Sequence, residues 1–342
     1  MKPDDFSSLD PFPVTYQELH DYFSAREVVN LFSLREETFR RIQLITGRPL
    51  ICYVAKTHHL SSGIPAYIDD GDLTGFGDLI RSVQGLAGPL GIQQEAVDVF
   101  IESNGGSPEA AERIVRLLRE HFRVVRFIVP ANAYSAATLI CFSGDEIIMD
   151  SLGTLGPIDP QINGVPARAI LRAFETIEKR LKEEGPRALT AYMPLISKYD
   201  LHILEMCKSY QELSQELARN WLCTYMLKCN EDDNRIKSII DFFSNYDLHK
   251  SHGRGIDRRT AYQLGLNVEN VEKTEGLADL VRSLHNQYEL WFDKTSFYKV
   301  FENMRGISWG RQTQTVTLQL PVLTPPGVPQ PVPQPGPPER TG

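Results

Sequence analysis

Two strand-turn-helix units follow each other between residues 97 and 142, and they constrain the fold of this chain more than any other feature. In the first unit (residues 97–118), an apolar run ends in a turn that contains Gly105 and Gly106. In the second unit (residues 124–142), an apolar run ends at a proline and Ser135 then opens an apolar helix. Such units predict parallel strands joined by right-handed crossovers, so that both turns lie at one edge of the sheet. We therefore expect the two glycines and Ser135 to be neighbours.

This arrangement suggests acyl-transfer chemistry. Paired glycines let backbone N–H groups face a ligand, and a helix N-terminus favours negative charge, so the turn at Gly105 and Gly106 can form an oxyanion hole. Ser135, followed by the small residues Ala136 and Ala137, can present its hydroxyl to the same space as a nucleophile. The alternative is that Ser135 only caps the helix, as serine commonly does.

Several motifs resemble the serine dehydrogenase proteinase family of the ClpP/crotonase superfamily, to which signal-peptide peptidase A is related. The similarity covers roughly residues 50–271 and is carried by the following segments: Asn104-Gly105-Gly106, Val129-Pro130, Tyr134-Ser135-Ala136, Gly144-Asp145-Glu146-Ile147-Ile148-Met149 and Leu155-Gly156-Pro157-Ile158-Asp159-Pro160-Gln161. The last segment is the most specific.

The resemblance implies an α/β protein with a ClpP/crotonase-like core of repeated ββα units in a spiral, extended by N- and C-terminal helices. It also implies a serine peptidase, ATP-independent or assisted by a partner, that forms an acyl-enzyme at Ser135. The oxyanion hole would use the backbone of Gly105, Gly106 and Ala136. The chain departs from the family at two places: Ser103-Asn104 replaces Thr-Pro, and Ala137 replaces glycine. A methyl group at position 137 would narrow the site or accompany a loss of activity.

A serine nucleophile needs a base to take its proton. ClpP-like peptidases place a histidine about two dozen residues after the serine and an aspartate further on. Here Asp159 occupies the first place and His252 lies near the second, so the residue types are exchanged. Because triads are defined by geometry rather than chain order, we predict a Ser135-His252-Asp159 triad. The alternative is that Asp159 caps a turn and His252 lies on a polar loop.

A lysine base, as in the signal-peptide peptidase relatives, is the competing hypothesis. Lys179, Lys182 and Lys198 fall in the expected range. A lysine must be desolvated before it can act as a base, and the first two lie in a charge run typical of a solvated helix face. Two other functions also stay open at this stage: a crotonase-like acyl-CoA enzyme, which uses a carboxylate as acid and base, and a catalytically inactive scaffold of the same fold.

The composition favours a cytoplasmic enzyme. The net charge of −8 and the scattered basic residues argue against nucleic-acid binding, and the five cysteines form no CxxC pair, as expected of reduced thiols. No run reaches the eighteen apolar residues of a membrane helix, so no integral membrane segment is predicted. No cofactor is expected. No metal is expected either, because His58-His59 has no second ligand cluster at a useful spacing.

The chain divides into four predicted parts. Residues 1–46 form an N-terminal helical arm, and residues 47–275 form the catalytic core, with a helical insertion at 167–243 that would roof the site. Residues 276–310 form a C-terminal helix, and residues 311–342 form a proline-rich, disordered tail that could dock a proline-motif partner. Peptide or protein substrates and a homo-oligomer are the other expected partners.

Overall fold

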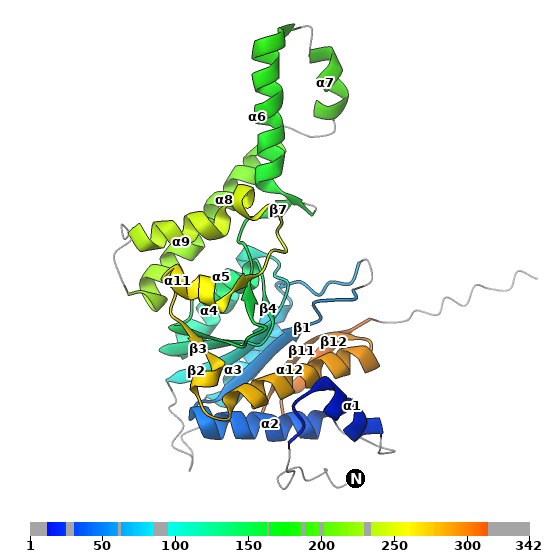
Figure 1. Cartoon of the computed structure of the whole chain (residues 1–342), viewed down its shortest axis with the longest axis vertical. Coiled ribbons are helices and arrows are strands. Elements are labelled where there is room, and N and C mark those ends of the chain that lie inside the picture. The colour runs from blue at the N-terminus through cyan, green and yellow to red at the C-terminus, as the bar shows by residue number, and fades with distance from the viewer. Residues whose placement is uncertain are drawn as a thin grey trace, which may run out of the picture.

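The computed structural model describes residues 12–24, 31–60, 63–84, 95–162, 164–186, 189–197, 202–228 and 234–313 (Figure 1). The helices are α1 (Tyr16–Ser24), α2 (Leu31–Thr46), α3 (Asp72–Val83), α4 (Pro108–His121), α5 (Ala136–Phe142), α6 (Ala167–Glu184), α7 (Leu189–Ile196), α8 (His202–Trp221), the π-helical turn η2 (Leu222–Met226), α9 (Asn234–Ser244), α10 (Tyr246–His249), α11 (Arg258–Gln263), the 3₁₀ turn η3 (Val271–Lys273) and α12 (Leu277–Lys294). The strands are β1 (Leu50–Ala55), β2 (Ala96–Glu102), β3 (Val124–Val129), β4 (Asn132–Ala133), β5 (Glu146–Met149), β6 (Thr154–Leu155), β7 (Gln161–Ile162), β8 (Val165–Pro166), β9 (Ile256–Asp257), β10 (Val268–Asn270), β11 (Phe297–Asn303) and β12 (Ser308–Gln312).

A seven-stranded sheet in the order β10-β5-β3-β2-β1-β11-β12 forms the centre of the molecule. The five strands from β10 to β1 are parallel, and the β11–β12 hairpin adds antiparallel strands beyond β1. The predicted parallel pairing of β2 with β3 is therefore confirmed. The strand β10 pairs in parallel with β5 and forms one edge of this sheet.

Each face of the sheet is covered by helices, because alternate strand residues point to opposite sides. Val99 and Phe127 pack on one face among residues of α3, α4, α5, α8 and α9. Phe100 and Ile128, the next residues along the same strands, pack on the other face against α2 and α12. Figure 1 shows α2 and α12 together below the sheet, with α1 beside them. The result is a three-layer α/β fold with helical additions at both ends of the chain.

The predicted C-terminal helix is too long. The helix α12 ends at Lys294, and residues 297–312 instead form the β11–β12 hairpin. The charged side chains of Lys299 and Glu302 are both buried in this hairpin. Lys299 Nζ lies 2.9 Å from Asp72 Oδ1, and Glu302 Oε2 lies 2.6 Å from the Arg35 Nε. These partners come from distant parts of the chain, so the local pattern could not indicate a strand.

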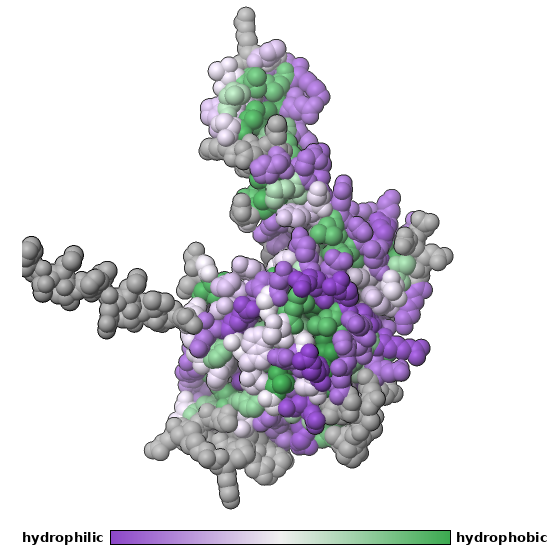
Figure 2. Space-filling model, turned by 180° about the vertical axis from the view of Figure 1, so that it is seen from behind, coloured by the Kyte–Doolittle hydropathy of each residue, from purple (hydrophilic) through white to green (hydrophobic). Residues whose placement is uncertain are grey.

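The helical insertion rises from the body as an arm made of α6 and α7, with α8 leading back toward the sheet (Figure 1). Apolar side chains lie at the outer end of this arm (Figure 2), and Leu189, Met193 and Leu195 of α7 are 40 to 52% exposed. Across the described residues, no helix is both long and apolar enough to cross a membrane. The proline-rich tail lies outside the described residues apart from its first three positions.

Candidate active site

Ser135 lies immediately before α5 in an unusual backbone conformation. Its φ is 51° and its ψ is −117°, a strained combination for a residue with a side chain. The Ser135 side chain makes no capping hydrogen bond to the helix, so the N-cap alternative does not account for this serine. Strain of this kind persists only where the surrounding structure holds it in place.

The Gly105-Gly106 turn lies directly against Ser135, as predicted. A Cβ atom added to Gly105 would lie 2.6 Å from the Ser135 Cβ and 3.0 Å from the Ala136 nitrogen. The φ of Gly105 is +96°, which disfavours a side chain for a second reason. Any other residue at position 105 would push the turn away from the serine.

Two backbone amides remain available to an oxyanion. The Gly105 amide donates to Ser103 Oγ at 3.1 Å, so this N–H is already used and the glycine serves through its lack of a side chain. The Gly105 carbonyl accepts from the Ile68 amide, and the Ser107 amide donates to the Ile68 carbonyl. Because these two groups point to the Ile68 side of the extended chain, the Gly106 N–H between them points to the opposite side. A side chain at Gly106 would collide with the Ile68 backbone. Ala136, the first residue of α5, supplies the second amide.

The segment that carries Asp159 is fixed to the start of α5. Thr138 Oγ1 accepts from the Gly156 amide at 2.9 Å, and its single proton faces the Ala133 carbonyl at 2.6 Å, with the Gly156 carbonyl 3.0 Å away. Gly156 also packs so closely on Tyr134 that a Cβ would lie 2.8 Å from the Tyr134 Cα. The Ile158 amide then donates to the Phe243 carbonyl. Together these contacts hold the next residue, Asp159, behind the serine.

A second pairing brings His252 to the same place. The strands β6 and β9 pair antiparallel with Leu155 opposite Ile256. Asp159 lies four residues after Leu155 and His252 four residues before Ile256, so the two side chains continue the same register. The His252 Nδ1 lies 2.9 Å from Asp159 Oδ1, and the Asp159 side chain is only 1% exposed.

This contact determines which nitrogen of His252 can act as a base. A carboxylate only accepts hydrogen bonds, so Nδ1 carries the proton and Nε2 of the neutral ring keeps a lone pair. The other oxygen of Asp159, Oδ2, is buried without a hydrogen-bond partner among the described residues. A buried carboxylate with one orphan oxygen is costly, and its one partner is the imidazole.

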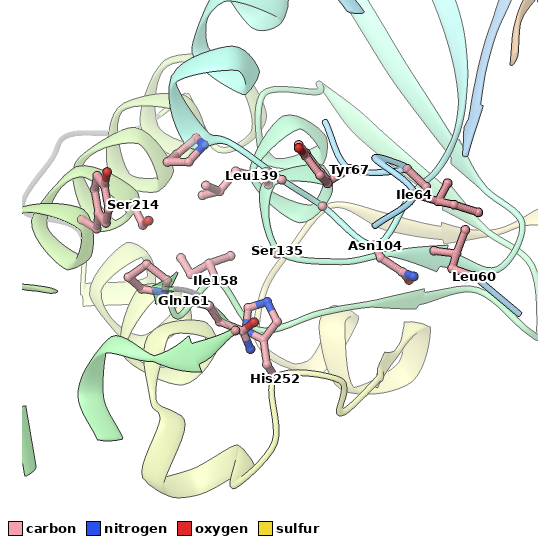
Figure 3. A pocket seen from close by; sticks show the side chains of 18 residues that line it. Leu60, Ile64, Tyr67, Asn104, Ser135, Leu139, Ile158, Gln161, Ser214 and His252 are labelled. Atoms are coloured by element: carbon pink, nitrogen blue, oxygen red, sulfur yellow. The ribbon is translucent and has the colours of Figure 1, made fainter. Parts of the chain in front are cut away.

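Ser135 and His252 line the same pocket of about 650 Å³, together with the Gly105-Gly106 turn (Figure 3). Figure 3 shows Ser135 between His252 and Gln161 on one side and Asn104 and Ile64 on the other. The remaining wall is largely apolar and includes Leu60, Ala66, Tyr67, Leu139, Ile158, Pro160, Tyr210 and Ser214. The last two belong to α8, so part of the helical insertion covers the site.

The predicted lysine bases lie elsewhere. Lys179 and Lys182 project from α6 with side chains 76% and 73% exposed, and their ammonium groups pair with Glu183 and Glu178. Neither lines the pocket. Lys198 lies outside the described residues. Because both side chains are exposed and lie outside the pocket, Lys179 and Lys182 are unsuited to the role of base.

Two features were missed from the sequence. Thr138 joins α5 to the Asp159 segment, and the only available signal was a polar residue within the apolar run 136–142. The environment of Ala137 was also misjudged, because its side chain is fully buried in the core and does not line the pocket. The methyl group at position 137 therefore does not narrow the site.

The family model for ClpP-like SDH-type serine proteinases matches residues 26–198, just over half of the 342-residue chain. The chain belongs to this family, and its class is that of the ClpP-like serine proteinases. Two uncharacterized proteins of Methanocaldococcus jannaschii are similar to it. MJ1495 is 28% identical over 54% of this chain and 62% of its own length. MJ0137 is 37% identical over 33% of this chain and 37% of its own length. The matched stretches thus span less than two thirds of either relative.

Solved structures with a similar fold include a mutant of ClpP1 from Listeria monocytogenes and a mutant of the membrane-bound stomatin-specific protease 1510-N. The first is 14% identical with a TM-score of 0.34 and covers 66% of this chain and 92% of that chain. The second is 16% identical with a TM-score of 0.35 and covers 59% and 74%.

Proposed function

We propose that this chain is a serine peptidase that forms an acyl-enzyme at Ser135, with His252 as general base and Asp159 orienting the imidazole. The observation that carries the proposal is the 2.9 Å contact between His252 and Asp159 within a site that also contains Ser135. The order of the three residues along the chain differs from that of ClpP-like peptidases, but their roles depend on geometry alone.

The proposed reaction begins when His252 Nε2 takes the proton of Ser135 Oγ as this oxygen attacks the scissile carbonyl carbon. A C–O bond forms, and the carbonyl electron pair moves onto its oxygen, where the Gly106 and Ala136 amides stabilise the charge. The C–N bond then breaks, and His252 gives its proton to the leaving amine. Water repeats the sequence to release the acid and free Ser135. We propose peptides or proteins as substrates.

The two alternatives have weaker support. A crotonase-like enzyme needs a carboxylate facing its substrate, and no aspartate or glutamate is among the described residues that line the pocket. The inactive scaffold was suggested by Ala137, whose methyl group packs in the core. The predicted homo-oligomer and cytoplasmic location stay predictions.

Treatment of the full chain with a fluorophosphonate, followed by peptide mapping by mass spectrometry, tests the proposal. We expect one adduct, on Ser135, which is lost in Ser135→Ala and kept in Ser238→Ala, an exposed serine on α9. Hydrolysis of a small activated ester should follow the same pattern. An adduct on another serine, or no adduct on folded protein, would contradict the proposed nucleophile.

A further inference from the structure

A second cluster of histidine and carboxylate side chains lies outside the pocket, at the carboxyl end of β2. Glu102 is the last residue of β2, and its side chain is 2% exposed. His285 and Glu289 project from α12 toward it. Because they are four residues apart, they lie on the same face of the helix. One ligand atom from each of the three side chains lies within 4.8 Å of the other two.

His58, on the loop after β1, extends this cluster. Its Nε2 lies 2.8 Å from Glu289 Oε2, while His285 Nδ1 lies 2.8 Å from Glu102 Oε2. His58 thus adds a second imidazole beside the three-residue group, through its contact with Glu289. His58 is also the most exposed of the four, with 44% of its side chain accessible, which provides an approach from solvent.

The buried groups of this cluster have shifted pKa values in the metal-free protein. Burial and the Glu102 carboxylate raise the pKa of Glu289 to about 7. Burial alone would lower the pKa of His285, but the Glu102 carboxylate outweighs it and raises this pKa to about 9. At neutral pH the His285 imidazolium already supplies a positive charge beside the Glu102 carboxylate, and a metal ion that binds here would take the place of its proton.

We propose that Glu102, His285, Glu289 and His58 bind one divalent transition-metal ion, of which Zn²⁺ is the best match. Imidazole nitrogen and carboxylate oxygen are ordinary zinc ligands with bond lengths of about 2.0–2.2 Å, so tetrahedral ligand atoms lie roughly 3.4 Å apart. The ligand atoms of Glu102, His285 and Glu289 lie within 4.8 Å of one another, and the two ion pairs of 2.8 Å would open to this spacing when a metal binds. Four ligands from three elements form a closed site, which is typical of a structural metal.

The ion would connect α12 to the strand that leads into the Gly105-Gly106 turn. Glu102 precedes that turn by only three residues, and the adjoining loop is already tied to it, since Asn104 Nδ2 donates to the Thr57 carbonyl at 2.7 Å. The metal site is thus a structural support next to the active site. It does not depend on the proposed peptidase activity.

Calorimetric titration of the chelator-treated full chain with Zn²⁺ tests the proposal, together with the visible spectrum of the Co²⁺ form. We expect one equivalent to bind and the Co²⁺ form to show d–d bands of a four-coordinate site without thiolate charge-transfer bands. Glu102→Gln and His285→Gln should abolish binding, whereas His202→Gln, an exposed histidine on α8, should retain it.

His58→Gln provides a test that does not depend on the buried residues, because its side chain is half-exposed. We expect zinc to bind at least ~10-fold more weakly to this variant while the melting temperature of the metal-free protein stays unchanged. Absence of saturable binding to the wild-type chain would overturn the proposal. Binding that is equally tight in wild type, His58→Gln and His285→Gln would overturn it as well.

Discussion

Two histidines in this chain contact a buried carboxylate through Nδ1, yet their surroundings differ. His252 pairs with Asp159 at 2.9 Å, and His285 pairs with Glu102 at 2.8 Å. Both carboxylates are about 1% exposed. Beside the first pair is Ser135 in an open pocket, and beside the second is another carboxylate, that of Glu289.

We propose that the group beside each histidine-carboxylate pair gives the pair its role. The Ser135 hydroxyl, for which the described part of the chain offers no hydrogen-bond partner, can give its proton to a free imidazole nitrogen, so the first pair suits the proposed role of base. A second carboxylate offers no proton to abstract and instead adds negative charge, so the second pair suits cation binding. Replacing each of the two histidines in turn tests this difference.

Replacing His252 should lower activity far more than replacing His285, and this is the largest difference that we expect. We expect His252→Ala to reduce kcat for ester hydrolysis on the order of 10⁶-fold, as loss of a triad histidine does. His285→Gln should lose at most about 10-fold per folded molecule, because this residue does not line the pocket. Steady-state kinetics on both variants would check this, and similar losses in the two would remove the distinction between the sites.

Replacing Asp159 should mainly lower activity, whereas replacing Glu102 should mainly lower stability. Asp159→Asn keeps the shape of the side chain but favours the wrong imidazole tautomer, so we expect kcat to fall ~10⁴-fold. Glu102→Gln leaves the charged His285 without its buried partner and should cost ~3–5 kcal/mol in the free energy of unfolding. Ester hydrolysis and urea denaturation of both variants are the measurements. A large stability loss in Asp159→Asn with retained activity would assign it a structural role.

A single methyl group in the Gly105-Gly106 turn should lower kcat. In Gly106→Ala the new Cβ would collide with the Ile68 backbone and displace the amide that faces the substrate. We expect kcat to fall ~10²–10³-fold, the usual effect of losing one oxyanion donor. Gly77→Ala is the matched control, since nothing lies within 4 Å of a Cβ at that helical position. Equal activity of the two variants would argue against a role for the Gly106 amide.

Metal removal should have the smallest effect. At a zinc concentration 100 times its Kd, binding stabilises the folded chain by ~2.7 kcal/mol. For a protein of this size we expect chelation to lower the melting temperature by roughly 2–4 °C per kcal/mol. Differential scanning calorimetry with and without chelator measures the shift. The same treatment of His285→Gln is the control, and its melting temperature should not respond.

Much of the active edge could be predicted from the sequence because the signals are local. The apolar runs, the glycine pair and the helix that follows Ser135 lie within 46 consecutive residues, and the handedness of parallel crossovers brings their turns together. The contact between Gly105 and Ser135 was expected on this basis and is present. The hydrogen bond from the Gly105 amide to Ser103 Oγ could not be predicted, because it depends on one side-chain rotamer.

The C-terminal region could not be predicted in the same way. The hairpin of β11 and β12 lies where the sequence predicted the last part of a helix, and Lys299 and Glu302 are buried in it. Their partners Asp72 and Arg35 lie more than 220 residues away in sequence. No local pattern contains that information, so only the assembled sheet could show that these charges are buried.

The sequence by itself determined the α/β class, the parallel strands and the meeting of Ser135 with the paired glycines. These depend on hydrophobic periodicity, on glycine conformation and on backbone chirality, which act over short stretches of chain. Only the tertiary structure decided that His252 reaches Asp159, 93 residues away, and that His58 and His285 share one cluster. Side chains from distant segments meet only when the strands and helices pack, because their contacts depend on the register and burial of the whole fold.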